Sequence, residues 1–261
     1  MRRMATGLTI KVLGSGTSHG VPMIACSCPV CTSADPRDKR SRPSIAVQYD
    51  ETILLIDTGP ELRLQCIAND IRRADAVLYT HHHIDHIAGL DDLRRFNWVQ
   101  KQVIPCYGQT ETLDRLRSMF AYAFDPHNDY PSATPRLSLR AVEGPFEIGG
   151  REITPIPVLH GALPILGFRI GGFAYCTDVS EIPPQSRGLL AGLDVLMLDA
   201  LRKRPHPTHF NLEQAVTCAR EIGARRTFFT HIAHELPHEE TNRSLPAGMA
   251  LAFDGQTIVV G

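Results

Sequence analysis

The segment 80–86 reads Thr-His-His-His-Ile-Asp-His, and it restricts the possible folds of this 261-residue chain more than any other feature. It places four imidazoles and one carboxylate within a few residues of one another. Packing these groups together without a cation is electrostatically costly, and nothing about an ordinary hydrophobic core requires it. The segment therefore predicts a metal site.

The position of this segment, after a predicted strand and at the start of a predicted helix, favours two adjacent ligand sets. Side chains alternate along an extended chain, so His81 and His83 point the same way while His82 points elsewhere. Asp85 and His86 lie at the helix start, where the chain turns and both side chains can face one point.

Further candidate ligands appear one at a time, each at the end of a predicted strand. His160 follows residues 154–159, Asp178 follows 173–177 and His231 follows 226–230. Rigid scaffolds commonly place chemistry on loops at strand ends, so we expect these side chains to join the site. Isolated histidines are more often structural, which is the role expected of His19, His127, His206 and His238.

The pattern of apolar residues predicts two β-rich halves with covering helices, which is typical of a layered α/β sandwich. The expected strands are residues 9–13, 44–49, 52–57 and 76–80, then 152–157, 167–170, 173–177, 195–199 and 226–230. The expected helices are residues 87–99 and 212–222. Because no repeat, low-complexity tract or flexible linker divides the chain, we predict a single domain over residues 1–261.

Composition narrows the classes of partner. Lys plus Arg number 27 and Asp plus Glu number 28, so no broad positive field would attract long nucleic acid. The apolar runs fall far short of the roughly 20 residues that span a bilayer, so no membrane segment is expected. The basic start at residues 1–4 lacks the apolar stretch of a secretory signal, and we expect a cytoplasmic protein.

Three of the seven cysteines, Cys26, Cys28 and Cys31, form a CxCxxC motif, which favours thiolate ligands over a disulfide framework. They would nearly complete a tetrahedral structural zinc site, and we expect His234 as the fourth ligand. The other cysteines are expected to be small buried hydrophobes; they are Cys66, Cys106, Cys176 and Cys218. The Gly-rich segment 14–22 before this motif lacks the GK[ST] of a P-loop.

Residues 80–86 resemble the HxHxDH signature of the metallo-β-lactamase superfamily, and Leu-Ile-Asp-Thr-Gly at 55–59 resembles the DxG segment of that fold. The resemblance implies an αββα sandwich with two central mixed sheets flanked by helices. It implies that one metal is held by His81, His83 and His160, and the other by Asp85, His86 and His231, with Asp178 bridging. Asp57 would orient the metal loop. Zinc is the metal we expect, although such ligands also suit manganese or iron.

The glycine loop leading into Gly-Val-Pro and CxCxxC resembles the PhnP group of phosphodiesterases, which is related to tRNase Z. This resemblance implies hydrolysis of a small phosphodiester, such as a ribose cyclic phosphate or a nucleotide-like molecule, by a hydroxide shared between two metals. His209 would contact the phosphate and protonate the leaving oxygen, and Asp199 would orient His209. Asp85 would hold its metal and accept a proton from water.

Other functions compatible with the same ligands are a glyoxalase II-type thioesterase, a tRNase Z-like RNA 3′-end nuclease and a non-catalytic PqqB-like binding protein. The basic run 202–204 is expected to be a solvated loop, and the Pro-rich segment 125–135 an irregular surface loop. Trp98, Tyr122 and Tyr130 are candidates for stacking a base, although core packing is the commoner role. Oligomeric state is open between a monomer and a homodimer.

Overall fold

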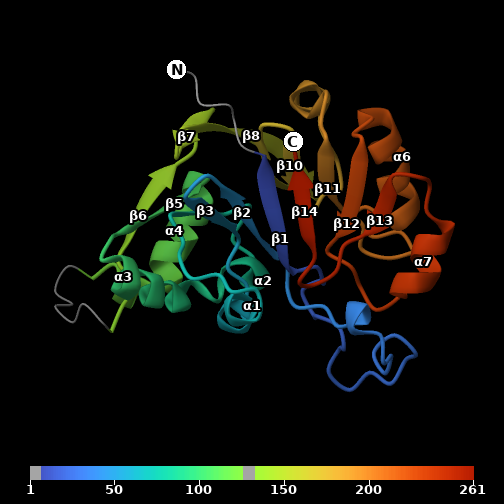
Figure 1. Ribbon diagram of the computed structural model, residues 1–261, viewed down its shortest axis with the longest axis horizontal. Coiled ribbons are helices and arrows are strands. Elements are labelled where there is room, and N and C mark those ends of the chain that lie inside the picture. Colours follow the sequence, from blue (N-terminus) through green and yellow to red (C-terminus); the bar gives the residue numbers. More distant parts are fainter. Residues whose placement is uncertain (1–6, 126–132) are drawn as a thin grey trace.

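The computed structural model describes residues 7–125 and 133–261, which form two β-sheets with helices on their outer faces (Figure 1). The first seven-stranded sheet has the order β14-β1-β2-β3-β4-β5-β6, and the second has the order β13-β12-β11-β10-β9-β8-β7. The strands of the first sheet are β1 (Leu8–Gly14), β2 (Ser44–Tyr49), β3 (Thr52–Ile56), β4 (Ala76–Leu78), β5 (Ile104–Gly108), β6 (Leu137–Ala141) and β14 (Thr257–Val260). Those of the second are β7 (Phe146–Ile148), β8 (Arg151–His160), β9 (Leu163–Ile170), β10 (Phe173–Cys176), β11 (Val195–Asp199), β12 (Arg226–Thr230) and β13 (Met249–Leu251).

The helices cover both outer faces, which confirms the predicted αββα sandwich. On the first sheet lie α1 (Leu62–Ala68), α2 (Ile84–Ile87), α3 (Arg94–Gln100) and α4 (Thr110–Met119), with the short η2 (Leu90–Leu93) and η3 (Ala121–Ala123). On the second lie α5 (Pro184–Arg187), η4 (Gly188–Leu190) and α6 (Leu212–Ile222), and α7 (His238–Ser244) follows β12. A further turn, η1 (Pro36–Asp38), belongs to the N-terminal loop. Among the described residues, no helix is long and apolar enough to cross a membrane.

The largest hydrophobic cluster lies between the two sheets and draws on both halves of the chain. Ile10 and Val47 of the first sheet belong to the same buried cluster as Phe168 and Phe173 of the second. Separate clusters fill the space between each sheet and its helices. The shared central core supports the single-domain organisation, which stays a prediction.

Each sheet has an antiparallel part and a parallel part. β3, β4, β5 and β6 run parallel to one another, and so do β10, β11, β12 and β13. The carboxyl ends of parallel strands share one edge of a sheet, and the loops that leave that edge can meet over a common point. The ends of β8 and β11 and the loops after β3, β4, β10, β11 and β12 carry the predicted active-site residues.

The prediction of one helix over residues 87–99 is wrong, because the chain is interrupted at Gly89 between α2 and η2. The Gly89 N–H donates to the Thr58 carbonyl at 2.8 Å. A Cβ atom at Gly89 would lie 2.1 Å from the Gly59 carbonyl oxygen. The close approach of the 57–59 turn therefore ends α2 and fixes the metal-loop segment against it.

The strand predicted over residues 152–157 extends to His160 as β8, although it contains Pro155 and Pro157. Proline is tolerated where its missing N–H would face an unpaired edge. The Leu159 N–H points away from β9, to the Glu181 carbonyl, so the nitrogens of both prolines face that same side. His160 is therefore the last residue of β8, at its carboxyl end.

Candidate metal centre

The turn after β3 holds the loop that follows β4 through the carboxylate of Asp57. The Thr80 N–H donates to Asp57 Oδ1 at 2.8 Å, and the Thr80 hydroxyl donates to Oδ2 at 2.8 Å. His86 Nδ1 lies 2.7 Å from the same Oδ2. Because an ionised carboxylate only accepts, Nδ1 of His86 carries a proton, and Nε2 is the nitrogen that can bind a metal.

The Thr80 hydroxyl also determines which ring nitrogen of His81 carries a proton. Its hydrogen is used toward Asp57, so its oxygen accepts from His81 Nδ1, which lies 3.0 Å away. Nε2 of His81 is then the free lone pair. Asp57 therefore lies where it was predicted to orient the metal loop, and it acts on two imidazoles.

His81, His83 and His160 come together as the first predicted ligand set. Their ligand atoms lie within 4.8 Å of one another, and the ring centroids of His83 and His160 are 5.1 Å apart. The Nδ1–H of His160 donates to the Thr208 carbonyl at 2.7 Å, which leaves Nε2 of His160 free. Burial lowers the pKa of His81 and of His160, which favours the neutral imidazole that binds a metal.

The second predicted set, Asp85, His86, Asp178 and His231, is buried throughout. His86 Nε2 lies 3.2 Å from Asp178 Oδ1, and His231 Nε2 lies 3.2 Å from Asp178 Oδ2. Asp178 Oδ2 is also 3.9 Å from His81 Nε2, in the first set. Asp178 therefore lies between the two sets, at the place predicted for a bridging ligand.

The electrostatics of the second set favour a cation between its side chains. Although burial opposes the charged imidazole, the carboxylates of Asp178 and Asp85 hold the pKa of His86 well above its usual value. Burial also opposes protonation of His231, yet Asp178 raises its pKa as well. The two carboxylates thus attract positive charge to a point that a divalent cation can occupy.

Several imidazole nitrogens at this point are buried without a hydrogen-bond partner among the described residues: His81 Nε2, His86 Nε2 and His231 Nε2. Buried polar atoms are normally satisfied, and each exception needs a cause. Three buried imidazole nitrogens without a hydrogen-bond partner, close to two carboxylates, fit divalent metals of the zinc type.

The backbone at the site is unusual. Asp57, Asp178 and His231 have φ values of 62°, 58° and 60°. L-residues rarely adopt this left-handed region, although Asp and His do so more readily than bulky residues, and such conformations often occur at functional sites. Asp57 and His231 directly follow β3 and β12, and Asp178 lies two residues after the end of β10, so the left-handed backbone turns the chain at each of these strand ends.

His209 borders both ligand sets without belonging to either predicted one. Its ring stacks on His231 at 4.7 Å between centroids and lies edge-on to His160 at 4.5 Å. Asp199, at the end of β11, has Oδ1 3.4 Å from His209 Nδ1 and 3.5 Å from His231 Nδ1. Asp199 Oδ2 also accepts the Phe210 N–H at 3.0 Å, which fixes the segment that carries His209.

The CxCxxC motif and His234 also meet. The sulfurs of Cys26, Cys28 and Cys31 lie 3.2, 3.4 and 3.6 Å from His234 Nδ1. A tetrahedral zinc with Zn–S near 2.3 Å and Zn–N near 2.0–2.1 Å would separate sulfur and nitrogen by roughly 3.6 Å. The Cys31 N–H donates to the Cys28 sulfur and lowers the pKa of that thiol to about 6, so Cys28 is a thiolate at neutral pH, whereas burial raises the pKa of Cys31 to about 11.

The Gly-rich segment before this motif clasps the loop that carries His231. The Ile232 N–H donates to the Ser15 carbonyl at 2.9 Å, and the Thr17 N–H donates to the Ile232 carbonyl at 3.1 Å. Asp254 holds the segment in turn, because it accepts from the Ser15 N–H and hydroxyl and from the Ser41 N–H. The segment therefore stabilises the His231 loop through backbone hydrogen bonds, which is consistent with the absence of a P-loop sequence.

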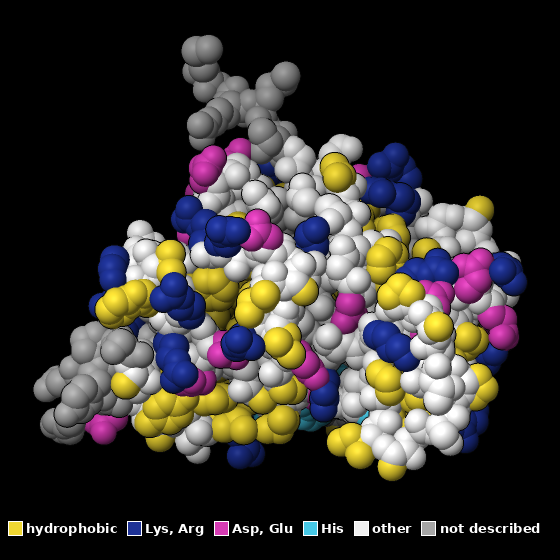
Figure 2. All heavy atoms as spheres, turned by 60° about the horizontal axis from the view of Figure 1, so that its bottom comes forward, with side chains coloured by type: hydrophobic (Ala, Val, Ile, Leu, Met, Phe, Trp, Pro, Cys, Tyr) yellow, Lys and Arg dark blue, Asp and Glu magenta, His cyan; other side chains and the backbone are white. Residues whose placement is uncertain are grey.

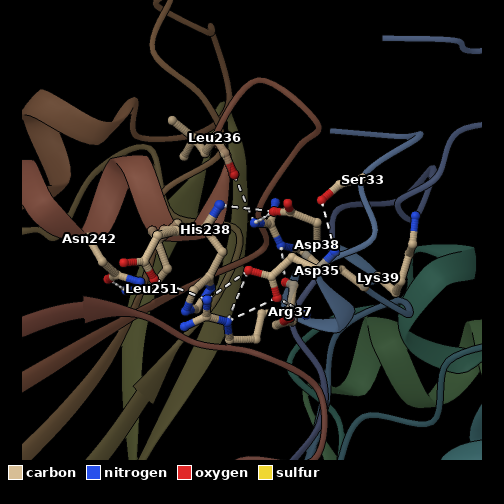
Figure 3. Close-up of polar contacts among 12 residues, drawn as sticks. Ser33, Asp35, Arg37, Asp38, Lys39, Leu236, His238, Asn242 and Leu251 are labelled. Carbon is tan, nitrogen blue, oxygen red and sulfur yellow. Dashed lines mark hydrogen bonds and ion pairs between the residues drawn. The ribbon is translucent and has the colours of Figure 1, made fainter. Parts of the chain in front are cut away.

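A buried polar network then ties the N-terminal loop to residues 233–238 (Figure 3). The Arg40 guanidinium donates to the carbonyls of Ala233 and Leu236 at 3.2 and 2.8 Å. Asp38 accepts from Arg40 and from the His238 N–H. These contacts fix residues 233, 236 and 238, on either side of His234 in the sequence. Arg40 and Asp38 belong to no recognisable motif, so the sequence alone does not predict them.

Two of the predicted stacking aromatics and the basic run contact charged side chains. Trp98 is half exposed under the Lys101 ammonium, and the Tyr122 hydroxyl donates to Asp91. Tyr130 and most of the predicted loop 125–135 lie outside the described residues. In the run 202–204, Arg204 pairs with Glu235 at 2.8 Å, as expected of a solvated loop.

The two active-site ligand sets lie where the loops at the strand ends meet, and their side chains are buried except that of His83. On the face that Figure 2 shows, the little histidine surface that is visible lies in a recess at the bottom of the molecule. Exposed apolar side chains occur on the nearby helices α1 and α2, including Leu64, Ile67 and Ile84. A ligand would reach the histidines from this side.

Residues 52–232 match the family model described as the β-lactamase superfamily domain. A crystal structure described as a new diphosphatase from the PhnP family is 46% identical to this chain, with a TM-score of 0.92 and 98% of each chain covered. Zn²⁺-bound PqqB from Methylobacterium extorquens is 23% identical, with a TM-score of 0.76 and coverage of 96% of this chain and 99% of that one. This second likeness shows the fold alone.

The octanoyltransferase of Porphyromonas gingivalis strain ATCC BAA-308 / W83 is 37% identical over 254 residues, which cover 95% of this chain and 51% of that protein. The chain thus spans about half the length of this curated relative, whose name describes the whole of it. The family model covers most of the chain, and the PhnP-family structure matches it over nearly its full length. This chain therefore belongs to the β-lactamase superfamily and, within it, to the PhnP family.

Proposed function

We propose that this chain is a metal-dependent hydrolase that cleaves a phosphodiester bond in a small, nucleotide-like molecule. The observation that carries the proposal is the meeting of two ligand sets at Asp178, with the non-ligand His209 against both. Zinc is the cation we expect in both positions, with manganese as the alternative. Two divalent cations in such a site would acidify a water molecule and neutralise charge on a phosphate oxygen.

The side chains of this protein divide the work of binding and orientation. His81, His83 and His160 would hold one cation, and the other would be held by Asp85, His86 and His231, with Asp178 shared. Asp57 keeps His86 in the tautomer that can bind. Asp85 also lies where it can accept a proton, 3.3 Å from His86 Nε2 and facing the same point.

His209 would contact the phosphate and protonate the leaving oxygen. Burial, together with the nearby His231, lowers the pKa of His209 to about 3, so the imidazole is neutral before substrate binds. The acid role needs the imidazolium. An anionic phosphate against Nε2 and the Asp199 carboxylate at Nδ1 would both stabilise that form.

The name of the PhnP-family relative supports chemistry at phosphorus and widens the choice of substrate. A diphosphatase cleaves between phosphoryl groups, so a disubstituted diphosphate belongs in the test beside a cyclic ribose phosphate. The nearly balanced charge of this chain favours either small molecule over long nucleic acid.

Cys26, Cys28, Cys31 and His234 would hold a third zinc with a structural role. A closed Cys₃His site would join the N-terminal loop to the segment after β12 and contribute folding free energy. The cytoplasmic location and the choice between monomer and homodimer stay predictions.

The test compares purified protein on bis(p-nitrophenyl) phosphate, 2′,3′-cyclic AMP, ADP-ribose, S-lactoylglutathione and a precursor tRNA, with metal content measured in parallel. We expect hydrolysis of one or more of the three small phosphate substrates and three metals per chain. Asp178→Asn keeps the backbone conformation but should abolish activity, whereas Cys218→Ser should not. Cleavage of the thioester alone would establish the glyoxalase II-type function instead, cleavage of the tRNA alone the nuclease, and metal-replete but inactive protein a PqqB-like binding role.

A further inference from the structure

The short turn before His209 fixes a second histidine in a defined hydrogen-bonding state. The Thr208 N–H donates to His206 Nδ1 at 3.3 Å, and the Thr208 hydroxyl lies 3.2 Å from the same nitrogen. A backbone N–H can only donate, so Nδ1 of His206 is an acceptor. The neutral His206 ring therefore carries its proton on Nε2.

Thr208 imposes the opposite state on His160. The Thr208 carbonyl can only accept, and His160 Nδ1 lies 2.7 Å from it, so Nδ1 of His160 carries the proton. One residue thus gives His160 a free Nε2 lone pair, as a metal ligand requires, and gives His206 an Nε2–H donor. His206 is therefore prepared to bind an oxygen rather than a cation.

The position of His206 places this donor beside the reacting centre. Its ring centroid is 5.1 Å from that of His209, which contacts both ligand sets. His209 is buried, whereas His206 is partly exposed, so His206 lies on the solvent side of His209. A substrate that extends outward from His209 would pass the His206 ring.

The charge around His206 suits an anion. The Arg202 guanidinium folds onto the same turn and donates to the carbonyls of Arg204 and Pro205 at 3.3 and 3.0 Å. It adds positive charge near His206, and the Glu235 carboxylate, 4.0 Å from the Arg202 guanidinium, offsets part of that charge. Phosphoryl oxygens bind well to N–H donors in such surroundings.

We propose that His206 contacts the substrate directly, donating its Nε2–H to a phosphoryl oxygen on the solvent side of His209. The inference rests on the proposed phosphodiesterase function and adds a binding residue to it. It also reverses the structural role that the sequence suggested for this isolated histidine. In this arrangement His209 contacts the two ligand sets, and His206 binds the part of the substrate that lies closer to solvent.

Kinetics and phosphate binding test the contact. A hydrogen bond to a charged oxygen is worth roughly a 10- to 100-fold change in binding, so His206→Ala should raise KM and weaken orthophosphate binding to the metal-loaded protein by about that factor. The metal content should be unchanged. His206→Gln retains an N–H donor and should restore part of the loss. His82→Ala, a partly exposed histidine of the metal loop that borders Glu111 and Arg115, serves as the matched control and should change both quantities less than about 2-fold.

The outcomes separate this inference from the proposed function. If the wild-type protein hydrolyses no phosphodiester, the proposed function fails. The phosphate affinities of wild type and His206→Ala, measured by calorimetry, still test the contact in that case. Equal KM and equal phosphate affinity in the two proteins would overturn the contact, as would a loss of metal in His206→Ala. In metal-free protein, long-range ¹H–¹⁵N spectra should show the proton on Nε2 of His206 and on Nδ1 of His160. A proton on Nδ1 of His206 would also overturn it.

Discussion

Asp57→Asn is the most informative single substitution, because it removes charge and one acceptor while keeping shape and backbone. Asparagine tolerates the φ of 62° at this position, so the turn after β3 should persist. The two carboxylate oxygens of Asp57 accept from three donors: the Thr80 N–H, the Thr80 hydroxyl and His86 Nδ1. An asparagine amide has only one oxygen to accept, and its NH₂ group replaces the other. Whichever way the amide turns, a buried donor loses its acceptor.

Both orientations have a calculable consequence. With NH₂ toward Thr80, the backbone N–H at Thr80 is left unpaired. With NH₂ toward His86, the imidazole must move its proton to Nε2, and it then has no lone pair for a metal. Leaving a buried donor unsatisfied costs about 1–3 kcal/mol, and disturbing the partner of a metal-bound histidine typically costs about 10- to 100-fold in metal affinity.

The assay is a zinc titration against a calibrated chelator, with unfolding by urea measured on the metal-free protein. We expect the weaker active-site affinity to fall by about 10- to 100-fold and the free energy of unfolding to fall by about 1–3 kcal/mol. Asp254→Asn is the control, because Asp254 is also buried and also accepts three hydrogen bonds, from Ser15 and Ser41 rather than from a histidine. It should lose stability while retaining zinc affinity. Unchanged zinc affinity in Asp57→Asn would refute the tautomer argument.

Three further predictions test other parts of the structure. His209→Ala should lower turnover by about 10²- to 10⁴-fold with full metal content, and undiminished activity on a diester with a poor leaving group would contradict its acid role. Cys28→Ala should lose one zinc per chain and lower the Tm, while Cys218→Ala should keep all metals; an unchanged zinc count in the first variant would dismiss the structural site. Gly16→Ala should destabilise the protein by about 1–3 kcal/mol, since its Cβ would lie 2.8 Å from the Arg40 carbonyl oxygen, whereas Gly144→Ala has nothing within 4 Å and should be neutral by urea unfolding.

The sequence predicted the layered fold and the residues that converge because both depend on local patterns. His160, Asp178 and His231 lie at or just after the ends of β8, β10 and β12, which run in the same direction, so their carboxyl ends share one edge of the second sheet. The contacts made by backbone groups could not be predicted in this way. The Thr208 carbonyl and N–H have no residue signature, so no sequence pattern distinguishes His206 from the other isolated histidines.

The errors in the fold have a similar origin in tertiary contact. Apolar periodicity continues through Gly89, but the approach of Gly59 breaks the helix there. The strand predicted over residues 152–157 ends before His160, whereas β8 continues to His160 because the nitrogens of Pro155 and Pro157 face an unpaired edge. Periodicity reports which face of a segment is apolar, and it does not report which backbone groups find partners.

The left-handed backbone at Asp178 and His231 limits how the metal preference of this centre could be changed by engineering. Only residues that accept this conformation, chiefly Gly, Asn, Asp and His, can stand there, so a thiolate or a longer carboxylate would carry a conformational cost besides its altered reach. Asp85 and His160 are free of that restriction. Retuning toward softer or larger ions should therefore begin at those two positions.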